Sequence, residues 1–166
     1  PVDVNKMGID LLSISAHKIY GPKGVGALYL RRKDPRVQLR PIMYGGGHEN
    51  GIRSGTLPVP NIVGFGRACE ISQKVMAKES RKINALRDNL ITMIQDSITS
   101  ATINGNQVYR LPGNLNMSFP GVTNEAMIAS LPEIAISSGA ACTTSTMEAS
   151  HVLLALGLSK DEAYSS

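Results

Sequence analysis

The sequence has no tryptophan, and aromatic residues make up only 4% of its 166 positions. Proteins that hold single-stranded nucleic acid use stacking aromatic side chains, and no such row or recognised nucleic-acid motif occurs here. The apolar runs, such as 25–30 and 152–156, are far shorter than the ~20 residues of a membrane-spanning helix. We therefore expect neither a nucleic-acid partner nor a membrane span.

Cysteine is scarce as well, with only Cys69 and Cys142 in the chain. Two cysteines make no disulfide framework, so we expect a reducing compartment, the bacterial cytoplasm or an organelle matrix, rather than secretion. No Cys/His pair has the spacing of a zinc site, because the three histidines are isolated from one another. Cys69 shares an apolar helical register with Phe65, which predicts a buried small side chain without chemistry.

Hydrophobic residues make up 42% of the chain, enough for a core, and the length suits one domain or pieces of two. The net charge of +4 is unevenly distributed. Between positions 17 and 53 there are eight lysines and arginines against two acidic residues, whereas 111–166 holds one basic residue against five acidic ones. The basic first third suits a small anion such as a phosphate.

The apolar periodicity predicts strands alternating with helices, and thus an α/β or α+β fold. Strands are expected at 10–15, 25–30, 115–119 and 133–137, a long helix at 61–98, and short helices at 124–130 and 150–156. The sequence from Ser159 to Glu162 has the S-x-x-E pattern of a capping box, which predicts one more helix start. Since position 1 is Pro and only four residues follow Glu162, we expect an internal piece of a longer protein.

The first chemical motif is SAHKIYGPKG at 15–24, directly after a predicted strand. An apolar wall around Lys18 would lower its pKa, and a neutral amine condenses with an aldehyde to a Schiff base. Ser15 and His17 can donate to a phosphate beside that lysine. The alternative is an ordinary solvated lysine at a strand end. The glycines of this segment fit neither a P-loop nor a dinucleotide-binding motif.

Two further motifs follow. GGGHENGIRSGTLP at 45–58 carries glycines that can expose backbone N–H groups to an anion, with Arg53 and Thr56 as side-chain donors; the alternative is a flexible linker. SSGAACTTST at 137–146 surrounds Cys142 with small residues that leave its thiol unpacked. A nearby cation would raise the thiolate fraction, whereas the alternative is a buried small side chain.

Together the three motifs resemble the cysteine desulfurases of group I, in the class V aminotransferase family of fold-type I pyridoxal-phosphate enzymes. The resemblance covers nearly the whole chain but only the C-terminal half of the family's sequence. It implies a partial α/β fold. Residues 1–75 would end the large cofactor-binding domain, the long helix would link the domains, and 76–166 would form most of a small α+β domain.

The resemblance also implies a chemistry, the conversion of L-cysteine to L-alanine. Lys18 would carry pyridoxal phosphate as a Schiff base and move protons, and Ser15 and His17 would hold the phosphate. Thr56 would reach the phosphate of a partner subunit, which implies a homodimer. Cys142 would accept sulfur as a persulfide and deliver it to acceptor proteins, iron–sulfur scaffolds among them, with a transient role toward iron as its only metal role.

The resemblance has gaps. Ala140, Met147 and Ala149 depart from the family pattern in the cysteine loop. The family's pyridine-nitrogen Asp and ring-stacking His would lie before Pro1, and its substrate-carboxylate Arg beyond Ser166. We therefore expect the chain by itself to fold weakly and to lack turnover. The alternatives are a non-catalytic module that binds iron–sulfur assembly partners, and a selenocysteine lyase or other class V activity.

Overall fold

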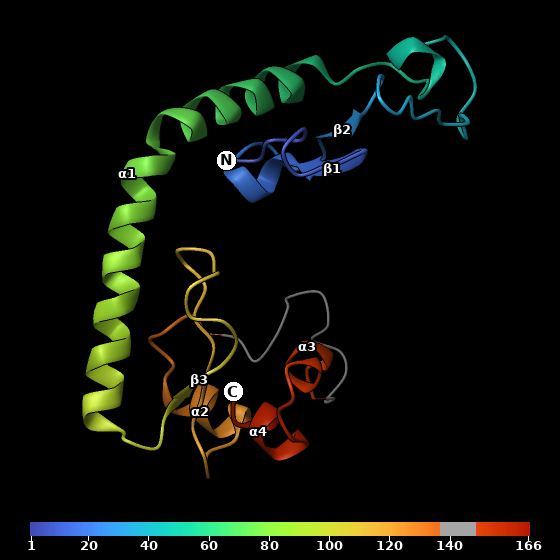
Figure 1. Cartoon of the computed structure of the whole chain (residues 1–166). Coiled ribbons are helices and arrows are strands. Elements are labelled where there is room, and N and C mark those ends of the chain that lie inside the picture. Colours follow the sequence, from blue (N-terminus) through green and yellow to red (C-terminus); the bar gives the residue numbers. More distant parts are fainter. Residues whose placement is uncertain (137–148) are drawn as a thin grey trace. The chain divides into compact units, whose positions relative to one another are not determined.

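The computed structural model describes residues 1–136 and 149–166. The chain divides into two compact units, Pro1–Met76 and Ala77–Ser166. Helix α1 (Val59–Ser97) runs through both of them and confirms the long helix predicted at 61–98 (Figure 1). That the units are the end of a large domain and most of a small one stays a prediction.

The first unit is built on a hairpin of two strands, β1 (Leu11–Ser15) and β2 (Gly26–Leu30), joined through the short 3-10 helix η1 (Ala16–Ile19). The strands are antiparallel, with Leu11 opposite Leu30 and Ser15 opposite Gly26. Position 26 must be glycine, because a Cβ there would lie 2.3 Å from the carbonyl oxygen of Ile14. Both strands were predicted, but the burial predicted for the first is wrong. Four of the five residues of β1 are exposed, because no third strand joins this sheet within the described residues.

Arg31, just after β2, fastens the N-terminal segment to the hairpin. Its guanidinium donates to the carbonyl oxygens of Val4 (2.8 Å) and Ile9 (2.9 Å) and to the side chain of Asn5 (3.2 Å), and it pairs with Asp10 at 3.0 Å. The Arg31 side chain is only 12% exposed to solvent. One planar fork thus satisfies several acceptors on the segment 4–10.

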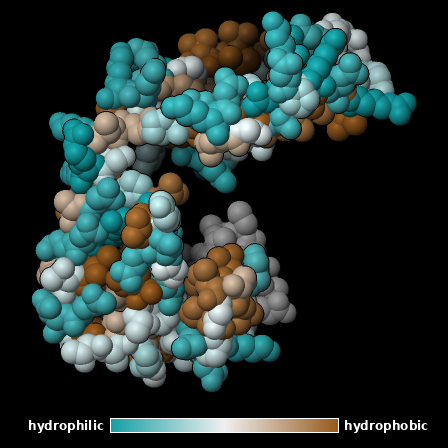
Figure 2. Space-filling model, viewed as in Figure 1, coloured by the Kyte–Doolittle hydropathy of each residue, from teal (hydrophilic) through white to brown (hydrophobic). Residues whose placement is uncertain are grey.

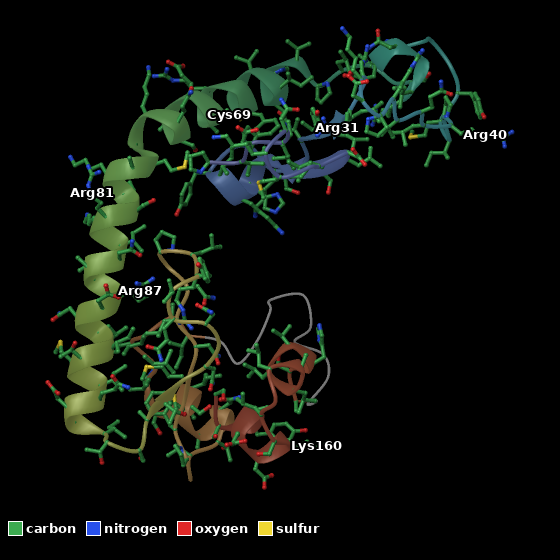
Figure 3. The ribbon with its side chains drawn as sticks, viewed as in Figure 1. Arg31, Arg40, Cys69, Arg81, Arg87 and Lys160 are labelled. Carbon is green, nitrogen blue, oxygen red and sulfur yellow. The ribbon has the colours of Figure 1, made fainter. Side chains whose placement is uncertain are left out.

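Helix α1 buries few of its apolar side chains. Phe65 and Ala68 are buried in its first half, but Cys69 is exposed, so the predicted burial of that cysteine is wrong (Figure 3). Apolar periodicity predicts which residues share the apolar face of a helix, but it does not predict whether another element covers that face. Glu70 pairs with Lys74 and Arg67 on the polar side of the helix, and these two cations, Lys74 most of all, hold the pKa of the Glu70 carboxyl below its usual value.

The second unit surrounds a small hairpin of β3 (Thr102–Ile103) and β4 (Met117–Ser118) with three short helices, α2 (Asn124–Ser130), α3 (His151–Ala155) and α4 (Lys160–Tyr164). All three helices were predicted. The strand predicted at 115–119 shortens to two residues. The strand predicted at 133–137 is wrong for 133–136, where Ile134 N–H turns back to the carbonyl of Leu131 at 3.0 Å; Ser137 lies outside the described residues.

A buried polar cluster ties β3, β4 and the end of α4 together. The Asn104 amide donates to Asn116 Oδ1 (2.7 Å), Ser118 Oγ (2.8 Å) and Ser166 Oγ (3.2 Å), and the two serine hydroxyls lie 2.6 Å apart. The buried apolar residues of this unit are Ala101, Met117, Leu153 and Ala163. The space-filling view in Figure 2 shows, by contrast, many apolar residues at the surface. Within the described ranges, no helix has the length and hydropathy to cross a membrane.

Candidate functional site

Residues 15–21, which we call the Lys18 turn, follow directly from β1. Ala16 is fully buried at their centre. Its N–H donates to the carbonyl of Val25 (3.1 Å), and its own carbonyl accepts from the N–H groups of Tyr20 and of Gly21 (2.9 Å). Tyr20 has a left-handed backbone, with φ of 62°, which reverses the chain. With the backbone closed around Ala16, the neighbouring side chains are displayed outward.

Ser15, His17 and Lys18 are displayed together on this turn. All three are exposed, and none of their side chains has a hydrogen-bond or ion-pair partner in the part of the chain that the structure describes. A hydroxyl and an imidazole N–H donate to phosphate oxygens, and a primary amine condenses with an aldehyde. The donor set therefore fits an aldehyde that carries a phosphate, as pyridoxal phosphate does.

The apolar wall expected around Lys18 is absent from the described residues. Lys18 is exposed because the turn sits at the end of a two-stranded sheet, with no further described strand beside it. The three sequence-predicted residues thus come together, but in an open arrangement.

The glycine-rich segment 43–57 folds into a compact loop rather than a linker. It includes the 3-10 turn η2 (Glu49–Gly51) and a parallel bridge between Met43 and Arg53. Gly47 N–H donates to the carbonyl of Gly45 (2.9 Å), and Gly55 N–H donates to His48 Nδ1 (3.3 Å). These N–H groups were expected to face an anion, and that expectation is wrong for them, because the loop's own acceptors already bind them.

Thr56 closes this loop, and its side chain is exposed. The loop leaves the hairpin at its Leu30 end, whereas the Lys18 turn lies at its Ser15 end (Figure 1). No hydrogen bond among the described residues joins Thr56 to the Lys18 turn. Thr56 is therefore not hydrogen-bonded to Ser15, His17 or Lys18 within the described part of this chain.

Cys142 lies outside the described residues, so its predicted roles as sulfur acceptor and transient iron contact stay predictions. In the rest of the chain, no cluster of three or more His, Cys, Asp or Glu side chains is placed to hold a metal ion. A cavity of about 540 Å³ lies at the Leu30 end of the hairpin, with Arg32, Arg36 and Asn50 in its lining. None of the predicted site residues lines it.

Sequence reasoning missed the residues that support the Lys18 turn from α1. Pro22 lies against Gly64, so closely that a Cβ at Gly64 would be 2.7 Å from Pro22 Cγ. Asn61 Nδ2 donates to the carbonyl of Lys23 at 3.3 Å. The available signal was a glycine inside a predicted helix, which often marks a close approach of two segments.

Comparisons with a family model and with individual known proteins point to the same family over nearly the whole chain. Residues 1–159 match the model of the family "Aminotransferase class-V". The chain is 54% identical over its full length to "Cysteine desulfurase IscS" of Aeromonas hydrophila and 49% identical to that of Rickettsia felis. It covers 41% and 40% of these relatives, so it spans about two fifths of their length.

A solved structure is similar too. The NifS-like protein from Rickettsia africae superposes with a TM-score of 0.83 at 32% identity, over 99% of this chain and 42% of that one. This likeness confirms the predicted fold class, a part of the fold-type I architecture. Class V aminotransferases and these relatives depend on pyridoxal phosphate, which the open Lys18 turn suits. The chain belongs to the aminotransferase class-V family.

Proposed function

We propose that the protein is a pyridoxal-phosphate-dependent cysteine desulfurase that converts L-cysteine to L-alanine. The observation that carries the proposal is the Lys18 turn, which offers an amine, a hydroxyl and an imidazole that have no other partners among the described residues. Support comes from relatives that bear this activity in their name, which match the whole of this chain over about two fifths of their own length. An aminotransferase without sulfur chemistry is disfavoured by Cys142 and the small residues that flank it in the sequence.

Each residue of the Lys18 turn has a role in this proposal. Lys18 holds the cofactor covalently and, once released by the substrate amine, moves a proton to and from the substrate Cα. Ser15 and His17 donate to the phosphate and so fix the cofactor's position relative to the Lys18 amine. When bound, pyridoxal phosphate supplies an electron sink that weakens bonds at the substrate's α and β carbons.

Cys142 completes the proposal on the sulfur side. Its thiolate attacks the sulfur of L-cysteine, whose Cβ–S bond breaks as the new S–S bond forms. Overall, L-cysteine and the Cys142 thiol become L-alanine and a Cys142 persulfide. Sulfur then passes to acceptor proteins, including scaffolds of iron–sulfur assembly, which is the stage where Cys142 would contact iron.

The assembly is also part of the proposal. We infer a homodimer in which Thr56 donates to the cofactor phosphate of the partner subunit, with the protein in a reducing compartment. The exposed hydroxyl of Thr56 at the end of the compact glycine loop is compatible with that reach. A Thr56→Val variant would keep the size of the side chain but remove the donor, and we expect weaker cofactor binding as a result.

The lysine is tested in the full-length protein by Lys18→Ala, with Lys23→Ala as the matched control. Lys23 is an exposed lysine of the same segment, and among the described residues its backbone carbonyl accepts a hydrogen bond from Asn61 while its side chain has no partner. We expect Lys18→Ala to lose the visible cofactor band and to slow alanine formation by about a thousandfold, since loss of an acid–base group typically costs 10²–10⁴. Lys23→Ala should retain both. Native-rate alanine formation in Lys18→Ala would overturn the proposal.

The cysteine is tested by Cys142→Ser against Cys69→Ser. Cys69 is an exposed cysteine on α1, so its replacement controls for a general thiol effect. After incubation with ³⁵S-labelled L-cysteine, we expect label on the wild type and on Cys69→Ser but not on Cys142→Ser. Labelling of Cys142→Ser at the wild-type level would exclude Cys142 as the sulfur acceptor.

A further inference from the structure

The Lys18 turn is held on one side by helix α1, through a contact between two residues without functional groups. Gly64 faces Pro22, and a Cβ built on Gly64 would lie 2.7 Å from Pro22 Cγ and 3.3 Å from its Cδ. Real Cβ atoms do not approach carbon atoms to 2.7 Å, so one of the two segments would have to move. The pyrrolidine ring is closed onto its own backbone, so Pro22 cannot give way without moving the chain.

Pro22 transmits such a movement to the turn through Gly21. The N–H of Gly21 donates to the carbonyl of Ala16 at 2.9 Å, and a Cβ on Gly21 would lie only 3.0 Å from that oxygen. Ala16 in turn is fully buried, and its N–H donates a hydrogen bond to the carbonyl of Val25. His17 and Lys18 follow Ala16 directly, so a shift of Pro22 changes the closure of the very turn that displays them.

A second contact fixes the same junction. Asn61, one helical turn before Gly64, donates from Nδ2 to the carbonyl of Lys23 at 3.3 Å. The start of α1 thus contacts both residues that follow Gly21, one by close packing and the other by a hydrogen bond. Both contacts lie within the first compact unit.

We propose that Gly64 is a positioning residue for Lys18, acting through Pro22 and Gly21 on the geometry of the Lys18 turn. The proposal extends the proposed function, because it names a determinant of how Lys18 meets the cofactor. Gly64 itself touches neither cofactor nor substrate in this argument.

The chain provides a matched control in Gly66, in the same turn of α1. A Cβ on Gly66 would have no heavy atom within 4 Å. Both Gly→Ala changes improve helix propensity equally, so propensity alone predicts that both variants are stabilised. Only Gly64→Ala places its methyl group against Pro22. Replacing Pro22 by Ala removes Cγ and Cδ and should make room for that methyl group.

The first measurement is amide hydrogen exchange in the full-length, cofactor-free protein. In Gly64→Ala we expect the amides of Ala16 and Gly21 to exchange about tenfold faster, the change produced by ~1.4 kcal/mol of overpacking strain. Gly66→Ala should leave both rates unchanged. Gly64→Ala with Pro22→Ala should return the rates to those of Pro22→Ala alone. Equal rates in the Gly64→Ala and Gly66→Ala variants would overturn the proposal.

The second measurement asks whether the shift reaches Lys18. Borohydride reduction followed by peptide mapping measures how much pyridoxal phosphate becomes fixed to Lys18. We expect several-fold less adduct in Gly64→Ala at limiting cofactor, none of that loss in Gly66→Ala, and recovery in the double variant. Unchanged trapping in Gly64→Ala would overturn the positioning role. Absence of adduct in the wild type would instead refute the proposed function, and the exchange rates would still decide whether Gly64 sets the turn.

Discussion

Arg31 shows how much of the first unit depends on a single side chain. Its guanidinium reaches carbonyl oxygens of Val4 and Ile9 and the carboxylate of Asp10, while most of the side chain is buried. These acceptors belong to a segment that forms no strand. The hydrogen bonds and the ion pair of Arg31, the residue after β2, hold this segment against the end of the strand. The segment's attachment is therefore specific to the fork geometry of arginine, not to its charge alone.

Replacing Arg31 by Lys tests this point at the scale of one residue. The ammonium group keeps the charge but cannot reach the several acceptors at once, so we expect a loss of about 2–3 kcal/mol in unfolding free energy. Urea unfolding of the full-length protein measures it. Arg32→Lys, next in the chain and exposed, is the control and should change little. If Arg31→Lys changed the unfolding free energy as little as Arg32→Lys, the charge alone would suffice for this attachment.

Asn104 has a comparable place in the second unit. Its amide is the shared donor to Ser118 and Ser166, and the residue is 9% exposed. Asn104→Ala leaves the buried hydroxyl of Ser118 and the half-buried hydroxyl of Ser166 without that donor, which should cost about 1–3 kcal/mol. Asn89→Ala on the exposed side of α1 is the control, where alanine's better helix propensity should be neutral or slightly stabilising. Calorimetric unfolding compares the two variants.

The elements that were predicted correctly are those whose sequence signal lies within the element itself. Helix α1 has sustained helical periodicity, and α4 begins at the expected capping box, in which Glu162 accepts from Ser159 N–H and Oγ (2.7 Å each). The strands depend on partners distant in the sequence. Met117–Ser118 pairs over two residues only, and 133–136 alternates like a strand but finds no partner among the described residues.

The same distinction applies to the candidate site. Ser15, His17 and Lys18 follow a strand in sequence, so their grouping on one turn could be predicted locally. The support of that turn by Gly64 could not, because a contact between Pro22 and a residue far along the chain depends on how α1 lies against the hairpin. The exposure of Lys18 and Cys69 was missed for the same reason, since burial is a property of neighbouring elements.

The capping box makes a prediction about α4 and pH. The bonds from Ser159 hold the pKa of the Glu162 carboxyl below its usual 4.5. A carboxyl with a depressed folded-state pKa stabilises the fold fully above its unfolded value, and that contribution disappears as the pH falls through the folded-state pKa. We therefore expect the protection factors of the α4 amides, which compare each exchange rate with the intrinsic rate at the same pH, to fall below about pH 4.5, as followed by NMR.

Two variants separate this effect from general acid unfolding. Glu162→Gln keeps an acceptor oxygen but cannot be protonated, so the protection factors of the α4 amides should lose their dependence on pH in that range. Ser159→Ala keeps the backbone N–H but removes the hydroxyl that bonds both the carboxylate and the N–H of Glu162, so it should lower the protection factors of α4 at every pH. A Glu162→Gln protein with an unchanged acid profile would assign the effect to another carboxyl group.

At the scale of the whole molecule, the limiting quantity is buried apolar surface. Seven apolar residues are buried within the described ranges, and four of them are alanine. None of the large side chains described is fully buried. A globular chain of this length normally buries roughly two-thirds of its unfolded surface, and that burial is what offsets the conformational entropy of folding.

We therefore expect these 166 residues, expressed by themselves, to lack a cooperative unfolding transition. Exposed apolar faces on both units should bind the dye ANS, and urea should cause a shallow, probe-dependent change, because few contacts disappear together. Helix α1 should still give a helical circular dichroism spectrum, since helical contacts are local. The full-length protein, measured in parallel, should bind little ANS and unfold steeply. A single steep transition of the 166 residues without ANS binding would show instead that the two units are stable with the core that they have here.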